Sequence, residues 1–179
     1  MKNLTLKIFT LFIVLFFSCT SLTIYAQGFS DYRLGVGDQL SITVFGEDEL
    51  STEVTLSDAG TISYPFLGEI KALDITIGEL STFITQKLAD GYLVNPSVNV
   101  QVIGYREFYI NGQVKKPGAY PYQPGLTLQK AIALAGGLTE RASKSKQYVM
   151  RDGQDKRKKI NSSNRILPGD VITVDESFF

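Results

Sequence analysis

The sequence of 179 residues contains no histidine, no tryptophan and a single cysteine. Without histidine the chain cannot build a Ser-His-Asp triad, a Cys-His pair or a zinc site of the HExxH type. One cysteine cannot form a disulfide within the chain or a multi-cysteine metal site. The 18 basic and 18 acidic side chains leave no net charge, which argues against nucleic acid as the main partner. Any catalysis would have to use carboxylates, lysine, tyrosine, serine or threonine.

The N-terminus has the parts of a secretory signal peptide. Two early lysines precede an apolar run at residues 8–17, and the small residue Ala26 stands before Gln27. The run is too short to span a membrane, which takes about 20 apolar residues. We therefore expect residues 1–26 to be a signal peptide that is cleaved between Ala26 and Gln27.

Cys19 has two interpretations. It follows the small residue Ser18, as the lipidated cysteine of a bacterial lipoprotein does, but Phe17 is bulkier than such signals prefer. Lipidation would anchor the protein to a membrane through acyl chains, each buried CH₂ contributing about 0.8 kcal/mol. We favour the other interpretation, in which Cys19 ends the apolar run and is removed with the signal, so that the mature chain has no thiol.

The first half of the remaining chain predicts strands and one helix. Apolar residues alternate at residues 40–44 and 98–102, and a hairpin is predicted where residues 54–56 and 62–66 flank an Asp-Ala-Gly turn. Between them Thr76 and Glu79 form a capping box, followed by apolar residues at helical spacing. The residues expected on the buried face of this helix are Ile77, Leu80, Phe83, Ile84 and Leu88.

The second half follows a similar plan. Residues 108–114 alternate, Thr127 can cap a short helix that two glycines close, and a hairpin turn is expected at residues 151–153. The residues expected on the buried face of this helix are Leu128, Ala131, Ile132, Leu134 and Ala135. A Pro-Gly-Asp turn at residues 168–170 leads into an alternating strand, as residues 36–38 do in the first half. These patterns predict an α+β fold of two small modules, each with strands and one packed helix.

No motif supports a catalytic, metal or cofactor site. The glycines at residues 35 and 37 lack the third glycine of a dinucleotide fingerprint, and the acidic residues 47–49 lack calcium-loop spacing. The basic run at residues 156–159 could meet an anionic polymer or lipid head groups, although a solvated hairpin edge explains it more simply. We expect no cofactor.

Tyrosines gather around the predicted strands of the second half. Aromatic rings with hydrogen-bonding tips suit sugar rings, and they equally suit a half-buried sheet. The candidate ligand-binding residues are Tyr105, Arg106, Tyr109, Asn111 and Tyr120.

Taken in order, these segments resemble the bacterial outer-membrane polysaccharide export family. The first part of the match comprises residues 32–40, 44, 46, 54, 58–62, 64–68, 76, 79, 80 and 95–98. The second part resembles the soluble-ligand-binding β-grasp (SLBB) module of this family, at residues 108–114, 117–120, 126–128, 135–137 and 168–172. The match covers nearly all of residues 31–174.

The resemblance implies an export N-terminal domain at residues 27–103 and a β-grasp SLBB domain at residues 104–179, with mixed or antiparallel sheets. It further implies a non-enzymatic protein of the periplasm, associated with the outer membrane, that forms a homo-oligomeric ring for capsule or exopolysaccharide. Its expected partners are the polysaccharide and an inner-membrane polysaccharide copolymerase. An outer-membrane lipoprotein attached through Cys19 is the alternative.

Larger members of this family carry a C-terminal amphipathic helix that crosses the outer membrane, whereas this chain ends five residues after Val174. We therefore expect a separate outer-membrane channel. Two other functions stay open: a stand-alone periplasmic module that binds carbohydrate or another ligand, and a glycan hydrolase using a carboxylate pair such as Asp38 and Glu47. Nothing in the spacing of that pair supports the hydrolase.

Overall fold

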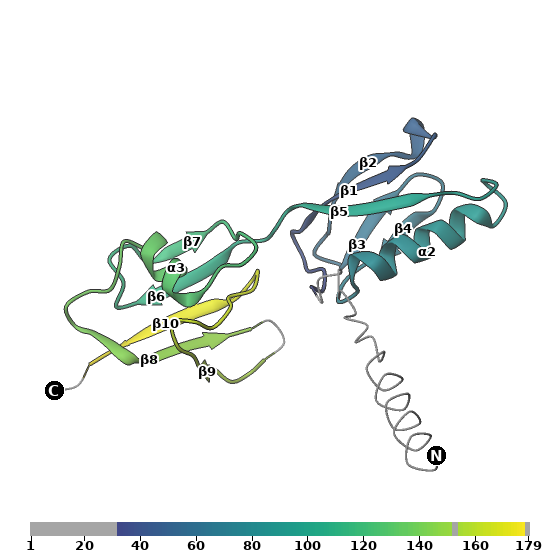
Figure 1. Ribbon diagram of the computed structural model, residues 1–179. Coiled ribbons are helices and arrows are strands. Elements are labelled where there is room, and N and C mark those ends of the chain that lie inside the picture. The colour runs from purple at the N-terminus through teal and green to yellow at the C-terminus, as the bar shows by residue number, and fades with distance from the viewer. Residues whose placement is uncertain (1–31, 152–153, 178–179) are drawn as a thin grey trace, which may run out of the picture. The chain divides into compact units, whose positions relative to one another are not determined.

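The computed structural model describes residues 32–151 and 154–177 (Figure 1). Apolar side chains gather in two cores, which belong to a first module (residues 32–104) and a second module (residues 108–177). Each module has its own sheet and its own helix, so the predicted α+β class is confirmed. The exact domain boundaries stay a prediction, and the expected cleavage site and Cys19 lie outside the described residues.

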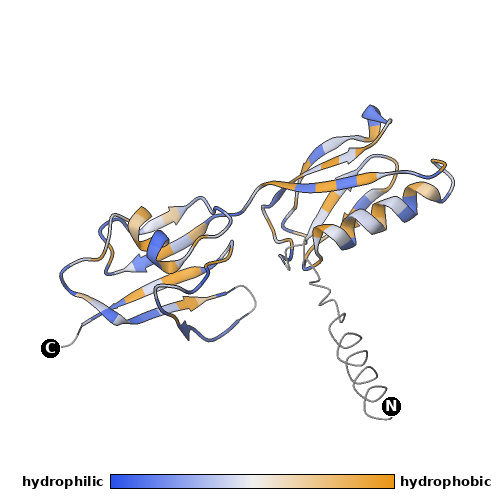
Figure 2. Ribbon diagram, in the orientation of Figure 1, coloured by the Kyte–Doolittle hydropathy of each residue, from blue (hydrophilic) through white to orange (hydrophobic). Residues whose placement is uncertain are grey.

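The first module contains a three-stranded antiparallel sheet in the order β2-β1-β5 and a separate hairpin of β3 and β4. Its elements are β1 (Gln39–Val44), the 3-10 helix η1 (Asp48–Leu50), β2 (Thr52–Thr55), β3 (Thr61–Tyr64), β4 (Gly68–Lys71), α2 (Ile77–Ala89) and β5 (Val98–Gly104). Along the central strand, Leu40, Ile42 and Val44 are buried, as their alternation predicts. Figure 2 shows the same alternation of hydrophobic and hydrophilic residues along β5.

Helix α2 begins at the predicted capping box. The Thr76 hydroxyl accepts a hydrogen bond from the Glu79 N–H at 3.2 Å, and the Glu79 carboxylate accepts one from the Thr76 N–H at 2.7 Å. The helix buries a stripe at i, i+4 spacing, made of Leu80, Ile84 and Leu88. The prediction that Phe83 faces the core is wrong: it lies beside this stripe and is 41% exposed.

The predicted hairpin across the Asp-Ala-Gly turn is also wrong. The turn exists, but β2 pairs with β1, whereas β3 pairs with β4. The Leu56 N–H donates to the Asp38 carbonyl and the Leu56 carbonyl accepts from the Gly37 N–H, both at 2.9 Å, which extends the pairing toward the start of β1. Phe66, expected in the returning strand, instead occupies the β3–β4 turn with a φ of 61° and is 67% exposed.

The second module has a five-stranded mixed sheet in the order β7-β6-β10-β8-β9. Its elements are β6 (Phe108–Gly112), β7 (Gly118–Tyr120), α3 (Leu128–Leu134), β8 (Ala142–Met150), β9 (Lys158–Lys159) and β10 (Val171–Glu176). The central strand β10 runs parallel to β6 and antiparallel to β8. One helix on a mixed sheet with this central parallel pair is the β-grasp-like arrangement that the resemblance implies.

Helix α3 is short and is capped at Thr127, whose hydroxyl accepts from the Lys130 N–H. Leu128, Ala131 and Ala135 are buried as expected, but Leu134 is 51% exposed, so its inward placement is wrong. A seven-residue helix has room for only a narrow buried stripe, and Leu134 falls outside it. Strands β8 and β9 pair on either side of the expected turn, of which residues 152–153 are not described.

Candidate functional site

The most connected polar cluster in the described chain surrounds Asp38, at the turn that leads into β1. The side chain is fully buried, and its Oδ2 accepts a hydrogen bond from the Gly35 N–H at 2.8 Å. The Asp38 N–H donates back to the Gly35 carbonyl at 3.1 Å. Gly37, with a φ of +91°, takes the left-handed conformation that the tight turn requires. The local sequence thus places a buried carboxylate at the start of the central strand.

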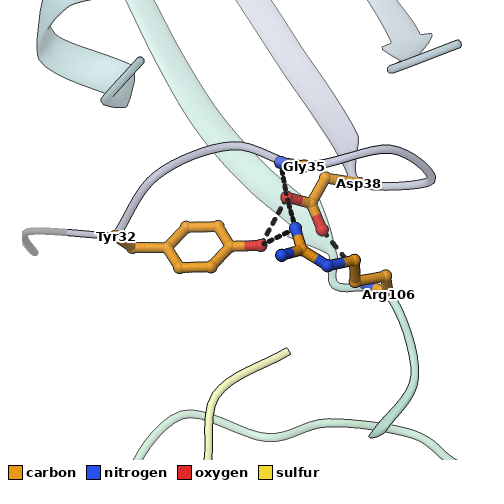
Figure 3. Close-up of polar contacts among 4 residues, drawn as sticks. All are labelled: Tyr32, Gly35, Asp38 and Arg106. Atoms are coloured by element: carbon orange, nitrogen blue, oxygen red, sulfur yellow. Dashed lines mark hydrogen bonds and ion pairs between the residues drawn. The ribbon is translucent and has the colours of Figure 1, made fainter. Parts of the chain in front are cut away.

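Arg106 and Tyr32 complete this cluster (Figure 3). The Arg106 backbone N–H donates to Asp38 Oδ1 at 3.1 Å, and its Nη1 forms an ion pair with Oδ2 at 3.4 Å. The Tyr32 hydroxyl donates to Oδ2 and accepts from Arg106 Nη1 at 3.2 Å. Gly35 leaves room for the guanidinium, because a Cβ there would lie 1.6 Å from Nη1. The cluster therefore fastens the segment that follows β5 to the segment that precedes β1.

The electrostatics suit a structural role. Burial, the hydrogen bond to Asp38 and the charge of Asp38 raise the pKa of Tyr32, so this hydroxyl stays protonated and acts as a donor. Burial and the same carboxylate also raise the pKa of Tyr105. Because four donor groups surround the Asp38 carboxylate, it holds the chain together and is not exposed as a base.

The second module repeats the motif at Asp170, which stands at the start of β10. Its Oδ2 accepts from the Leu167 N–H at 2.8 Å, its side chain is buried, and Gly169 before it has a φ of +81°. Arg151 pairs with its Oδ1 at 3.3 Å. The two Gly-Asp turns that look alike in the sequence thus form the same hydrogen bond and each contact one arginine. The repeated turn is visible in the sequence, whereas the burial of the two carboxylates is not.

The five candidate ligand-binding residues do not share one surface. Arg106 is engaged by Asp38, and the Tyr105 ring makes edge-on contacts with Tyr32 at 5.3 Å and Tyr122 at 5.2 Å between centroids. The Tyr120 ring stacks on the buried Phe108, and its hydroxyl donates to the Lys116 carbonyl.

Two of the five candidates, Tyr109 and Asn111, lie on the opposite face of β6 from the buried Phe108 and Ile110. Both are exposed, and Tyr109 lies beside Ala119 of β7 and Val171 of β10. A ligand-binding role for the five residues stays a prediction.

The hypothesis of a hydrolase based on Asp38 and Glu47 does not fit the geometry. The two residues flank the six-residue strand β1, which spans about 20 Å. Catalytic carboxylates of glycosidases lie about 5–9.5 Å apart. In addition, Asp38 is fully buried, whereas Glu47 is exposed.

The described chain shows neither a metal cluster nor a membrane-spanning helix. Over residues 32–151 and 154–177, no three acidic, cysteine or histidine side chains come together as metal ligands would. Within the same ranges, no helix has the length and apolar character needed to cross a bilayer.

Comparison with known families agrees with the two modules. Residues 26–103 match the family described as polysaccharide biosynthesis/export protein, and residues 108–160 match the SLBB domain. The chain thus carries a polysaccharide export domain followed by an SLBB domain. Both modules occur in the order that the sequence resemblance predicts.

Curated relatives carry names consistent with this family. The chain is 35% identical over 131 residues to the exopolysaccharide production protein ExoF of Rhizobium meliloti (strain 1021), covering 66% of this chain and 31% of that protein. It is 32% identical over 133 residues to the EPS I polysaccharide export outer membrane protein EpsA of Ralstonia solanacearum, covering 60% and 35%. The polysialic acid transport protein KpsD of Escherichia coli is 24% identical over 141 residues, covering 78% and 25%. The chain thus spans about a quarter to a third of the length of these relatives.

Proposed function

We propose that this protein is a non-enzymatic component of a machine that moves capsule or exopolysaccharide out of the cell. The observation that carries the proposal is the ordered pair of family matches, an export module followed by an SLBB module. The names of the relatives support it, since ExoF, EpsA and KpsD are named for the production, export or transport of polysaccharides.

In this role the protein lines a passage through which the glycan moves. A hydrated glycan can move past a surface that offers many weak hydrogen bonds and little net charge, because no single contact holds it for long. Once Lys2 and Lys7 leave with the signal peptide, 16 basic and 18 acidic side chains remain, and this small net charge suits the role. In the proposal, copies of the chain form a homo-oligomeric ring that works with an inner-membrane copolymerase and a separate outer-membrane channel.

A gene deletion tests the proposed function. Surface polysaccharide should disappear while the glycan continues to be made inside the cell, and a plasmid copy of the intact gene should restore export. Unchanged surface polysaccharide in the deletion strain, or loss of glycan synthesis itself, contradicts the proposal.

The proposed location is the periplasm, in association with the outer membrane. Cleavage after Ala26 should give a mature chain that begins at Gln27, which mass spectrometry of the purified protein can check. An acylated Cys19 at the N-terminus would instead establish the lipoprotein alternative, and Cys19→Ala should then release the protein from the membrane fraction.

A stand-alone binding module is the second candidate, favoured by the exposed Tyr109 and Asn111 on one face of the second sheet. Native mass spectrometry separates the two candidates. A ring of several copies supports the conduit, whereas a monomer that binds glycan supports the stand-alone module.

A further inference from the structure

A hollow of about 510 Å³ lies beside α3 in the second module, bounded by β8 and by the segment that follows β9. Its volume falls within the range of about 300–1,000 Å³ that is typical of small-molecule sites. All of its lining residues lie between Gln129 and Ser162, so it belongs to one module. None of the ligand-binding candidates predicted from the sequence lines it.

Gln147 of β8 is the most informative residue in this wall. The residue as a whole is only 6% exposed, and no other described residue forms a hydrogen bond with its side-chain amide. The amide atoms themselves reach the hollow, because they are not among the fully buried side-chain atoms that lack a partner. An amide that faces a hollow and has no protein partner is available to a ligand or to water.

The rest of the wall combines an apolar floor with uncharged polar groups. Ile132, Leu138 and Ile160 supply the apolar surface. The hydrogen-bonding side chains around it are Gln129, Ser145, Gln147, Asn161 and Ser162. A sugar ring has the matching chemistry, since its C–H face packs on apolar side chains while its neighbouring hydroxyls both donate to and accept from amides.

The charged residues in the wall of the hollow are all positive. Lys144 and Lys159 belong to the lining, which contains no acidic residue. Neither lysine has an ion-pair partner among residues 32–151 and 154–177. Two flexible cationic side chains without a counter-charge favour a ligand that carries an anionic group.

We propose that this hollow binds a carboxylated sugar residue, a hexuronic acid unit of the exported glycan, with the Gln147 amide hydrogen-bonding its hydroxyls and the lysines attracting its carboxylate. The proposal rests on the proposed export function, because it takes the glycan as the ligand. It adds to that function a class of glycan, the acidic polysaccharides, and a location for the binding site in the second module. The site would be weak and would bind one sugar unit of the polymer at a time.

Nuclear magnetic resonance of the ¹⁵N-labelled protein tests the site directly. D-glucuronate is titrated into the protein, with D-glucose and inorganic phosphate in parallel, and the side-chain amide signals of Gln147 and Gln129 are followed. We expect glucuronate to shift both signals with millimolar affinity, glucose to shift them more weakly, and phosphate to leave the Gln147 amide unchanged.

Gln147→Leu is the decisive variant and Gln123→Leu its control. Because the native amide has no protein partner, Q147L should keep the unfolding midpoint of the wild type, yet it should weaken glucuronate binding about tenfold, the effect of one lost hydrogen bond. Gln123 lies in an exposed loop outside the hollow, so Q123L should bind as the wild type does.

A pair of double variants tests the charge. K144Q/K159Q and K156Q/K158Q each remove two positive charges, but only the first pair belongs to the wall. The first should lose the preference for glucuronate over glucose, and the second should keep it. Equal loss in both would mean that overall charge attracts the ligand, which would overturn the assignment of the lysines.

Three further outcomes bear on whether the hollow binds a carboxylated sugar. No shift at Gln147 with glucuronate, equal shifts with phosphate, or unchanged binding by Q147L would overturn the proposal. These results are independent of the proposed function, because the deletion phenotype reports export without reference to the hollow.

Discussion

Replacing Asp38 by asparagine should destabilise the first module. Asparagine keeps the shape of the side chain but removes its charge and replaces one acceptor oxygen by an NH₂ group. Three donors converge on Oδ2, from Tyr32, Gly35 and Arg106, while the Arg106 backbone N–H points at Oδ1. In either orientation of the asparagine amide, its NH₂ group points at one or more of these N–H or O–H donors, which then lack an acceptor.

The expected loss follows from these contacts. A buried donor left without an acceptor costs about 1–3 kcal/mol, and hydrogen bonds to a charged acceptor weaken when the acceptor becomes neutral. The ion pair itself adds little, because one-fifth of the Arg106 side chain is exposed and water screens the pair. Together these effects give a decrease of about 2–4 kcal/mol in the free energy of unfolding.

Urea denaturation followed by circular dichroism measures this change, with amide signals from each module read separately by NMR. The first module should unfold at lower urea than in the wild type, while the second is unaffected. Asp58→Asn is the matched control, since Asp58 is exposed and such a change should stay within about 0.5 kcal/mol. A D38N midpoint equal to that of the wild type, or an equal drop in D58N, would refute the reasoning.

Two further predictions concern single groups. Because burial and Asp38 raise the pKa of Tyr32 in the folded state, its contribution to stability is complete below the unfolded value of about 10 and is lost as pH rises above it. The stability difference between the wild type and Tyr32→Phe, measured in urea, should therefore shrink above about pH 10; a constant difference contradicts this pKa. Gly112→Ala should destabilise the second module by more than about 1 kcal/mol, because Gly112 has a φ of +82° and a Cβ would lie 2.1 Å from the Val174 carbonyl oxygen. Thermal unfolding tests it, with Gly125→Ala as the control for positive φ in open space; equal losses in both variants would show that the contact with β10 is unimportant.

Features made by neighbouring residues were predicted well. The capping box of Thr76 and Glu79 spans three residues, and both of its hydrogen bonds form. The Gly-Asp turns before β1 and β10 are equally local, and their alternating strands follow as expected. Phe83 and Leu134 were misplaced because periodicity counts apolar residues, whereas burial depends on how wide a stripe the sheet beneath each helix can cover.

Pairings between distant residues were not predictable in the same way. Arg106 was predicted to bind ligand, but its partner Asp38 lies 68 positions earlier, and only the return of the chain after β5 brings the two together. Nothing in the sequence distinguishes Gln147 from any other glutamine in a strand, because only the fold places its amide at the wall of a hollow without a protein partner.

Short-range hydrogen bonding and patterns of apolar residues define the two modules, their order, the helix caps and the turns, so the amino-acid sequence alone is enough to predict them. Tertiary structure alone decided which strands pair, as β2 with β1 and β6 with β10, which charged side chains meet, and where a hollow lined by polar groups remains. The physical reason is that a hydrogen bond within one turn is possible in any conformation of the rest of the chain. A contact across 68 residues exists only once the cores have excluded water and brought those segments together.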